Sequence, residues 1–144
     1  MSKRSRKGGF TLAELLVVVA IIGILVAISI PIFTTQLHKA EVATDWANIR
    51  SYYSEIQTDY ISTGSFNAKV PDFYKDRDVE RREIDFLDGH KVKLKTGYFT
   101  VIWISTDNKF SENNGYQVTY YCNDCKTDWD KHKNTCVLTL GAGM

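Results

Sequence analysis

The stretch FTLAELLVVVAIIGILVAISIPIFTTQL, residues 10–37, decides the architecture of this chain of 144 residues. Between residues 15 and 37 it carries no charged side chain, and Leu, Val, Ile and Ala dominate it. A hydrocarbon core of ~30 Å needs roughly 20 apolar residues in a helix, and this run is long enough. We therefore expect a membrane-spanning helix over residues 10–33.

Four cations precede the apolar run: Lys3, Arg4, Arg6 and Lys7. Lys and Arg beside a first span are retained in the cytoplasm, so the rest of the chain is expected outside. A secretory signal peptide also begins with cations, but its apolar core is only roughly 7–15 residues long and small residues follow it. Here Gly8 and Gly9 come before the apolar run, so cleavage there would remove residues 1–9 as a leader and leave the helix on the mature chain.

Glu14 places a carboxylate inside the apolar segment, four residues after Phe10. Charge at such a depth is costly and usually functional. Cleavage after Gly9 would give Phe10 a free α-amino group, and this cation on one subunit could neutralise Glu14 on its neighbour. The alternative is that Glu14 lies near the lipid headgroups and is hydrated there. Both readings stay open on position alone, and the leader in front favours the pairing.

The stretch RKGGFTLAELL, residues 6–16, resembles the processing and methylation motif of type IV prepilins and the related pseudopilins. It combines a basic leader, a glycine before Phe10, Thr-Leu after it, Glu14 and an uninterrupted apolar helix, and chance seldom brings these together. The resemblance implies that a prepilin peptidase cuts between Gly9 and Phe10 and methylates the new amino group of Phe10. It also implies assembly through this helix, with Phe10 and Glu14 as the assembly residues.

Gly23 and Pro31 interrupt the apolar helix. In a helix interior Gly costs about 1 kcal/mol and Pro about 3 kcal/mol relative to Ala, and Pro also removes a hydrogen bond. Membrane helices nevertheless tolerate both residues. We expect a kink at these positions, and in the resembled family this region bends or partly unwinds in the filament.

Residues 34–63 are expected to continue the helix as an amphipathic segment. Its apolar positions recur at spacings of three and four: Val42, Trp46, Ile49, Tyr53, Ile56 and Tyr60. Polar residues fall between them and are assigned to a side that faces water or neighbouring subunits: Asp45, Asn48, Arg50, Glu55 and Asp59. The apolar stripe should therefore face a globular core. Thr63-Gly64 supplies the stop signal.

Residues 64–144 are predicted to be a β-rich region that packs with the amphipathic helix. An irregular connector over residues 66–82 precedes five segments that read as strands, over residues 83–87, 91–95, 98–105, 116–122 and 136–140. Asp88-Gly89-His90 is a turn signal between the first two. The fold class is α+β, a long N-terminal helix packed on a small antiparallel sheet of roughly four strands.

Three cysteines lie near the C-terminus: Cys122, Cys125 and Cys136. Together with His132 they have the ligand types of a small zinc site, but a disulfide is favoured because the region is expected outside the cytoplasm. We predict one disulfide that uses Cys136, with Cys122 as the favoured partner because both flank a loop between adjacent strands. The resembled pilins often close a C-terminal loop with one disulfide, so the third cysteine departs from that pattern.

Other function classes find little support in the sequence. The net charge of +1 argues against a dedicated nucleic-acid binder. The histidines stand in no nucleophile elbow, zinc-protease motif or phosphate loop, so an enzyme is not expected. We expect no cofactor and no metal.

The sequence leads to one main hypothesis and two alternatives. The chain is expected to be a structural subunit of a type IV pilus. It would be a single-pass protein of the inner (cytoplasmic) membrane until the pilus assembly machinery polymerises it with other pilin subunits into an extracellular filament for adhesion, motility or DNA uptake. The first alternative is a pseudopilin of a type II-like secretion or competence system. The second is a monomeric membrane-anchored binding protein, which would not need Gly9, Phe10 and Glu14 together.

Overall fold

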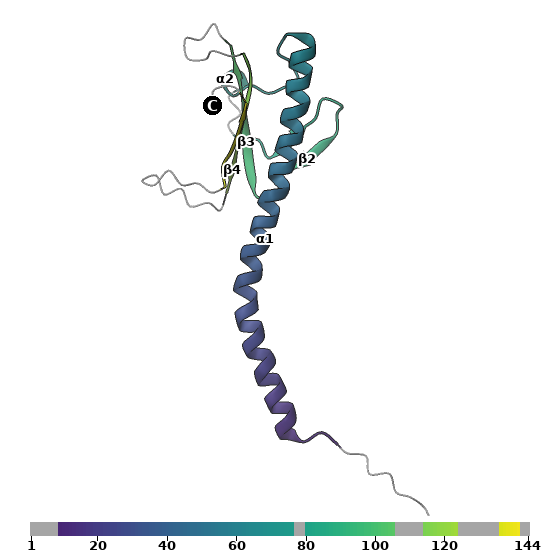
Figure 1. Ribbon diagram of the computed structural model, residues 1–144, viewed down its shortest axis with the longest axis vertical. Coiled ribbons are helices and arrows are strands. Elements are labelled where there is room, and N and C mark those ends of the chain that lie inside the picture. Colours follow the sequence, from purple (N-terminus) through teal and green to yellow (C-terminus); the bar gives the residue numbers. More distant parts are fainter. Residues whose placement is uncertain (1–8, 77–79, 106–113, 124–135, 142–144) are drawn as a thin grey trace, which may run out of the picture. The chain divides into compact units, whose positions relative to one another are not determined.

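A computed structural model describes residues 9–76, 80–105, 114–123 and 136–141 of the chain (Figure 1). The chain divides into two compact units, Met1–Leu37 and His38–Met144. One helix, α1 (Leu12–Thr63), contributes its first part to the first unit and the remainder to the second. The expectation of a long N-terminal helix is confirmed.

The C-terminal end of α1 lies at the predicted stop. Gly64 follows the helix with φ at 69°, in the left-handed region that glycine adopts without a steric penalty. Its backbone N–H donates to the carbonyl of Tyr60 at 2.8 Å, which satisfies a carbonyl of the last helical turn.

Within the described residues, five strands follow α1 and form two antiparallel sheets. The first is a hairpin of β1 (Glu83–Asp85) and β2 (Lys91–Lys93). The second contains β3 (Gly97–Ile104), β4 (Gly115–Cys122) and β5 (Leu138–Gly141), in that order. The predicted strands and the α+β class are confirmed.

The sequence predicted one sheet, but the described strands form two. The β1–β2 hairpin is separate from the three-stranded sheet of β3, β4 and β5. Arg81, just before β1, forms an isolated antiparallel bridge with Phe99 of β3 through two backbone hydrogen bonds of 3.2 and 2.9 Å. The connector also contains a short helix, α2 (Phe73–Asp76), where the sequence predicted irregular structure. The N–H of Tyr74 donates to the side chain of Asp72 at 3.3 Å at its start.

The predicted turn between β1 and β2 is present. Gly89 has φ at 95°, and the N–H of His90 donates to Oδ1 of Asp88 at 3.0 Å. The N–H of Phe86 donates to the carbonyl of His90 at 3.0 Å and closes the loop. The turn therefore rests on a glycine in the left-handed region and an aspartate that bonds the backbone two residues on.

The core of the second unit lies where the second part of α1 packs against the strands (Figure 1). The ring of Tyr52 meets Phe86 and Phe99 edge to face, with centroids 5.6 and 5.8 Å apart. On β4 the fully buried residues alternate along the strand: Tyr116, Val118 and Tyr120. This period of two is expected of a strand with one face on a core.

The buried face of α1 differs from the predicted stripe. Its buried residues are Val42, Asp45, Ile49, Tyr52 and Ile56. Other members of the predicted stripe are only partly buried against the core: Trp46, Tyr53 and Tyr60. The amphipathic character is present, but the assignment of Asp45 to the solvent side was wrong.

Asp45 can be fully buried because hydrogen bonds surround its carboxylate. Oδ1 accepts from the backbone N–H of Lys95 at 2.7 Å, and Oδ2 accepts from the backbone N–H of Thr96 at 2.9 Å. The hydroxyls of Thr96 and Tyr120 lie 3.2 and 3.0 Å from the same Oδ2 and 2.8 Å from each other. Burial is the largest of the effects on the pKa of the Tyr120 hydroxyl, and it raises that pKa. The hydroxyl therefore keeps its proton and can donate a hydrogen bond. Asp45 thus fixes α1 to the β2–β3 connection and to β4.

Candidate processing and assembly site

Gly9 and Phe10 lie directly before α1 and are exposed, and Phe10 exposes 89 % of its surface. Among the described residues, a Cβ placed on Gly9 would meet no atom within 4 Å. The described fold therefore gives no steric reason for a glycine at this position. A peptidase that must approach the backbone closely would supply one.

Glu14 and Thr11 form a capping box at the start of α1. The backbone N–H and the hydroxyl of Thr11 each donate to Oε2 of Glu14 at 2.8 Å. In return the N–H of Glu14 donates to Oγ1 of Thr11 at 3.3 Å. Two donors that the first turn of a helix leaves without partners are satisfied in this way.

The capping box is a role of Glu14 that the sequence analysis missed. The signal was present as Thr-x-x-Glu directly before an apolar run. Both residues follow the Gly9–Phe10 bond, so cleavage there would leave the cap on the mature chain. The pairing of Glu14 with the amine of Phe10 on a neighbouring subunit stays a prediction. Within its own chain, the Glu14 carboxylate accepts hydrogen bonds from Thr11.

The first part of α1 exposes apolar side chains along its whole length. By its length and apolar composition this part of the helix could cross a membrane, and the described residues bury none of it. Large apolar residues such as Val17, Ile21 and Leu25 expose more than half of their surfaces, at 58, 53 and 59 %. Such a surface needs lipid or other helices around it.

α1 continues through Gly23 and Pro31 as one helix. Around the proline, side-chain hydroxyls bond to backbone carbonyls: Ser29 to Leu25 at 2.7 Å, and Thr34 and Thr35 to Pro31 at 3.0 and 3.1 Å. Hydroxyls that bond one turn back in this way often accompany helix bends. The kink at Gly23 and Pro31 stays a prediction.

Comparison with known proteins agrees with this geometry. Residues 4–30 match the family model of the prokaryotic N-terminal methylation motif. The N-terminal segment thus carries this methylation motif. The type IV narrow pilus major component PilA5 of Thermus thermophilus is 50 % identical over 52 residues, which are 34 % of this chain and 45 % of the relative. The chain thus spans less than half the length of this curated relative.

The family match lies in the N-terminal segment of the chain. No solved structure matches the chain significantly.

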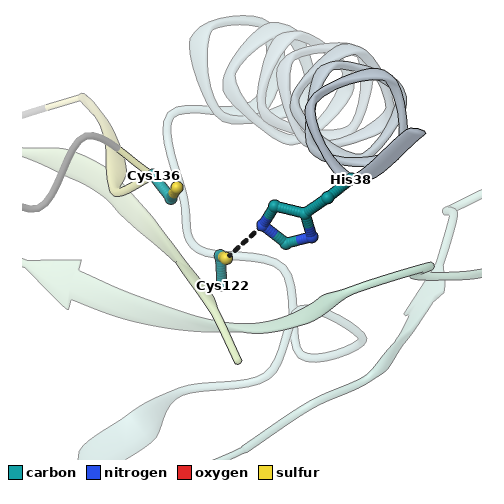
Figure 2. Close-up of side chains that lie close together, drawn as sticks. All are labelled: His38, Cys122 and Cys136. Atoms are coloured by element: carbon teal, nitrogen blue, oxygen red, sulfur yellow. Dashed lines mark hydrogen bonds between the residues drawn. The ribbon is translucent and has the colours of Figure 1, made fainter. Parts of the chain in front are cut away.

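The structure brings two of the three cysteines together with a histidine of α1 (Figure 2). Cys122, at the end of β4, is buried and keeps its thiol, whereas Cys136 is disulfide-bonded. The favoured Cys122–Cys136 disulfide is therefore wrong. The two residues face each other by extension of the β4–β5 register, but the Sγ of Cys122 lies 3.4 Å from Nε2 of His38. Cys125 and His132 lie outside the described residues.

Proposed function

We propose that the chain is the precursor of a structural subunit of a type IV pilus. A prepilin peptidase would cut between Gly9 and Phe10 and methylate the new amino group of Phe10. The observation that carries the proposal is the start of α1, where an exposed Gly9–Phe10 bond lies directly before a capped helix covered with apolar side chains.

The apolar surface of residues 12–37 fits two successive environments. Before assembly it would lie in the cytoplasmic membrane, with the four leader cations on the cytoplasmic side and the β-rich region outside. After cleavage it would pack against the same segment of other subunits in a filament core. The amphipathic residues 34–63 would stay with the β-rich region of residues 64–144 in both states.

Cleavage changes the electrostatics of the helix start. It removes the four cations of the leader and creates one amine at Phe10, four residues from Glu14. An unpaired carboxylate in hydrocarbon costs several kcal/mol, and pairing recovers much of this only when the neighbouring amine is in register. Glu14 would therefore favour one axial position of each subunit in the filament.

The similar protein of Thermus thermophilus is a major component of a pilus, and this supports a pilus subunit over a secretion pseudopilin. Such filaments would serve adhesion, motility or DNA uptake.

Immunogold electron microscopy of cells that make the tagged full-length chain, with intact-mass analysis of the membrane-extracted protein, tests the proposal. We expect label along surface filaments and a mature chain that begins at a methylated Phe10. A cleaved chain confined to the cell envelope would identify a pseudopilin instead. An uncleaved chain, in cells with an active prepilin peptidase, would support the monomeric anchored protein and overturn the proposal.

A further inference from the structure

A small pocket lies on the outer face of the three-stranded sheet, where α2 packs against β3 (Figure 1). Side chains alternate along β3, so those beside the core residues Phe99 and Val101 point to this outer face. The pocket has a volume of about 350 Å³. Small-molecule sites span roughly 300–1,000 Å³, so this one has room for a ligand of one or two rings. Its lining residues come from α2, β3 and β4: Phe73, Tyr98, Thr100, Ile102 and Tyr121.

Three aromatic rings form walls of the pocket. Tyr98 and Tyr121 are direct partners in the β3–β4 register, and their rings stack with centroids 5.2 Å apart and planes at 23°. Phe73 adds a ring from α2. All three residues are half-buried, so each keeps part of its surface accessible. Aromatic rings are partly negative on their faces and attract C–H groups of a ligand, which are partly positive.

Thr100 contributes a hydroxyl without a partner. This residue exposes only 8 % of its surface and lines the pocket. Within the described part of the chain, no group hydrogen-bonds to its hydroxyl. Buried polar side chains nearly always have a partner, so an unpaired one at the wall of a pocket points to a ligand that supplies it. Burial raises the pKa of Tyr98, whose hydroxyl therefore keeps its proton and can also donate.

The lining selects against two kinds of ligand. None of the five lining residues carries a carboxylate, an ammonium or a guanidinium group. A charged ligand would lose hydration there without gaining a counter-ion. A purely apolar ligand would leave the Thr100 hydroxyl unpaired. A pyranose sugar avoids both costs, because it is neutral, presents C–H groups on a face of its ring and carries hydroxyls around its rim.

We propose that this pocket binds a neutral pyranose sugar. The C–H face of the sugar would lie against the aromatic walls, and a sugar hydroxyl would bond the hydroxyl of Thr100. All five lining residues belong to one chain and lie outside the processing motif. The inference therefore goes beyond the proposed function and does not depend on cleavage or polymerisation.

The test uses the isotope-labelled full-length chain in micelles of dodecylphosphocholine, because detergents with sugar headgroups would compete. Glucose, galactose and N-acetylglucosamine are titrated one at a time, and the backbone amide shifts are followed by NMR. We expect at least one sugar to shift the amides of α2, β3 and β4 around the pocket. The Kd should be about 1–10 mM, as befits so small a neutral ligand.

Two variants and a control localise the binding. Thr100→Val keeps a similar shape and removes the hydroxyl, and Tyr121→Ala removes one aromatic wall. Each should raise the Kd at least fivefold. Thr119→Val is the matched control, because Thr119 is the register partner of Thr100 and exposes only 9 % of its surface, yet it does not line the pocket. Its Kd should stay within twofold of the wild-type value.

Three results would overturn the proposal. One is the absence of saturable shifts around the pocket with all three sugars, which needs no variant and so no assumption about folding. Another is equally tight binding of cyclohexanol, a ring of the same size with a single hydroxyl, since the pocket would then select for apolar surface alone. The third is a Thr100→Val chain that keeps the native amide spectrum and binds as tightly as Thr119→Val.

Discussion

Replacing Asp45 by Ala should destabilise the second unit strongly. The substitution removes the acceptor for two backbone N–H groups, those of Lys95 and Thr96. Of the hydroxyls of Thr96 and Tyr120, one can still donate to the other across 2.8 Å, which offsets part of their loss. A buried donor without an acceptor costs about 1–3 kcal/mol, and the partly exposed Lys95 loses less than the buried Thr96. We expect a loss of about 3 kcal/mol.

The assay is urea unfolding of the full-length chain in detergent, followed by tryptophan fluorescence. With an m-value of about 2 kcal/mol per molar urea, the midpoint should fall by about 1.5 M. Asp45→Asn keeps one acceptor oxygen and should lie between Asp45→Ala and wild type. Thr44→Ala is the control, because Thr44 is exposed on the same helix and its hydroxyl donates to the carbonyl of Ala40 one turn back. It should change stability by no more than about 0.5 kcal/mol. An Asp45→Ala midpoint equal to that of Thr44→Ala would refute the anchoring role.

Three further predictions address the sheet, the turn and the processing site. A Cβ at Gly97 would collide with the backbone oxygen of Tyr121 and the ring of Tyr120. Gly97→Ala should therefore lower the free energy of unfolding by about 1–3 kcal/mol or more in the same urea assay. A variant as stable as the wild type would contradict this close packing. Hydrogen bonds from the backbone N–H and the ring of His90 lower the pKa of Asp88. The stability that these bonds contribute is therefore complete above the ordinary aspartate pKa of about 3.9. It is lost as the pH falls through the lowered pKa. An NMR titration of Asp88 should accordingly give a midpoint below that of a free aspartate, and an ordinary midpoint would count against the turn geometry. Gly9→Val should keep the leader in intact-mass spectra, whereas Gly23→Ala, also a glycine with open space around it, should be cleaved normally; a cleaved Gly9→Val chain would place the processing site elsewhere.

The long helix, the strands and the turns could be predicted because their signals are local. The apolar run, the Thr63-Gly64 stop and the alternating residues of β4 each act within a few positions of one another. The capping box was equally local. It was missed because Glu14 was interpreted only as a charge in an apolar segment.

The contacts that escaped prediction join distant parts of the chain. Asp45 has a polar side chain between apolar positions, so periodicity placed it on the solvent side. Its partners Lys95 and Thr96 lie 50 and 51 residues further on. His38 likewise meets Cys122 only in the folded chain. A single sequence gives no signal for such pairs, because a buried polar residue becomes tolerable only through partners that the fold supplies.

Sheared-filament yield, measured beside the total membrane-bound subunit, tests most directly whether these chains polymerise through a charge-paired helix start. Glu14→Gln keeps the capping box, since Gln also serves at this position, but it cannot neutralise the Phe10 amine. Thr11→Ala is its counterpart, because it keeps the charge and removes the cap hydroxyl at a cost of about 1 kcal/mol at one helix end. We expect normal cleavage in both variants, filaments from Thr11→Ala and few or none from Glu14→Gln. Filaments from Glu14→Gln at the wild-type yield would contradict assembly through charge pairing.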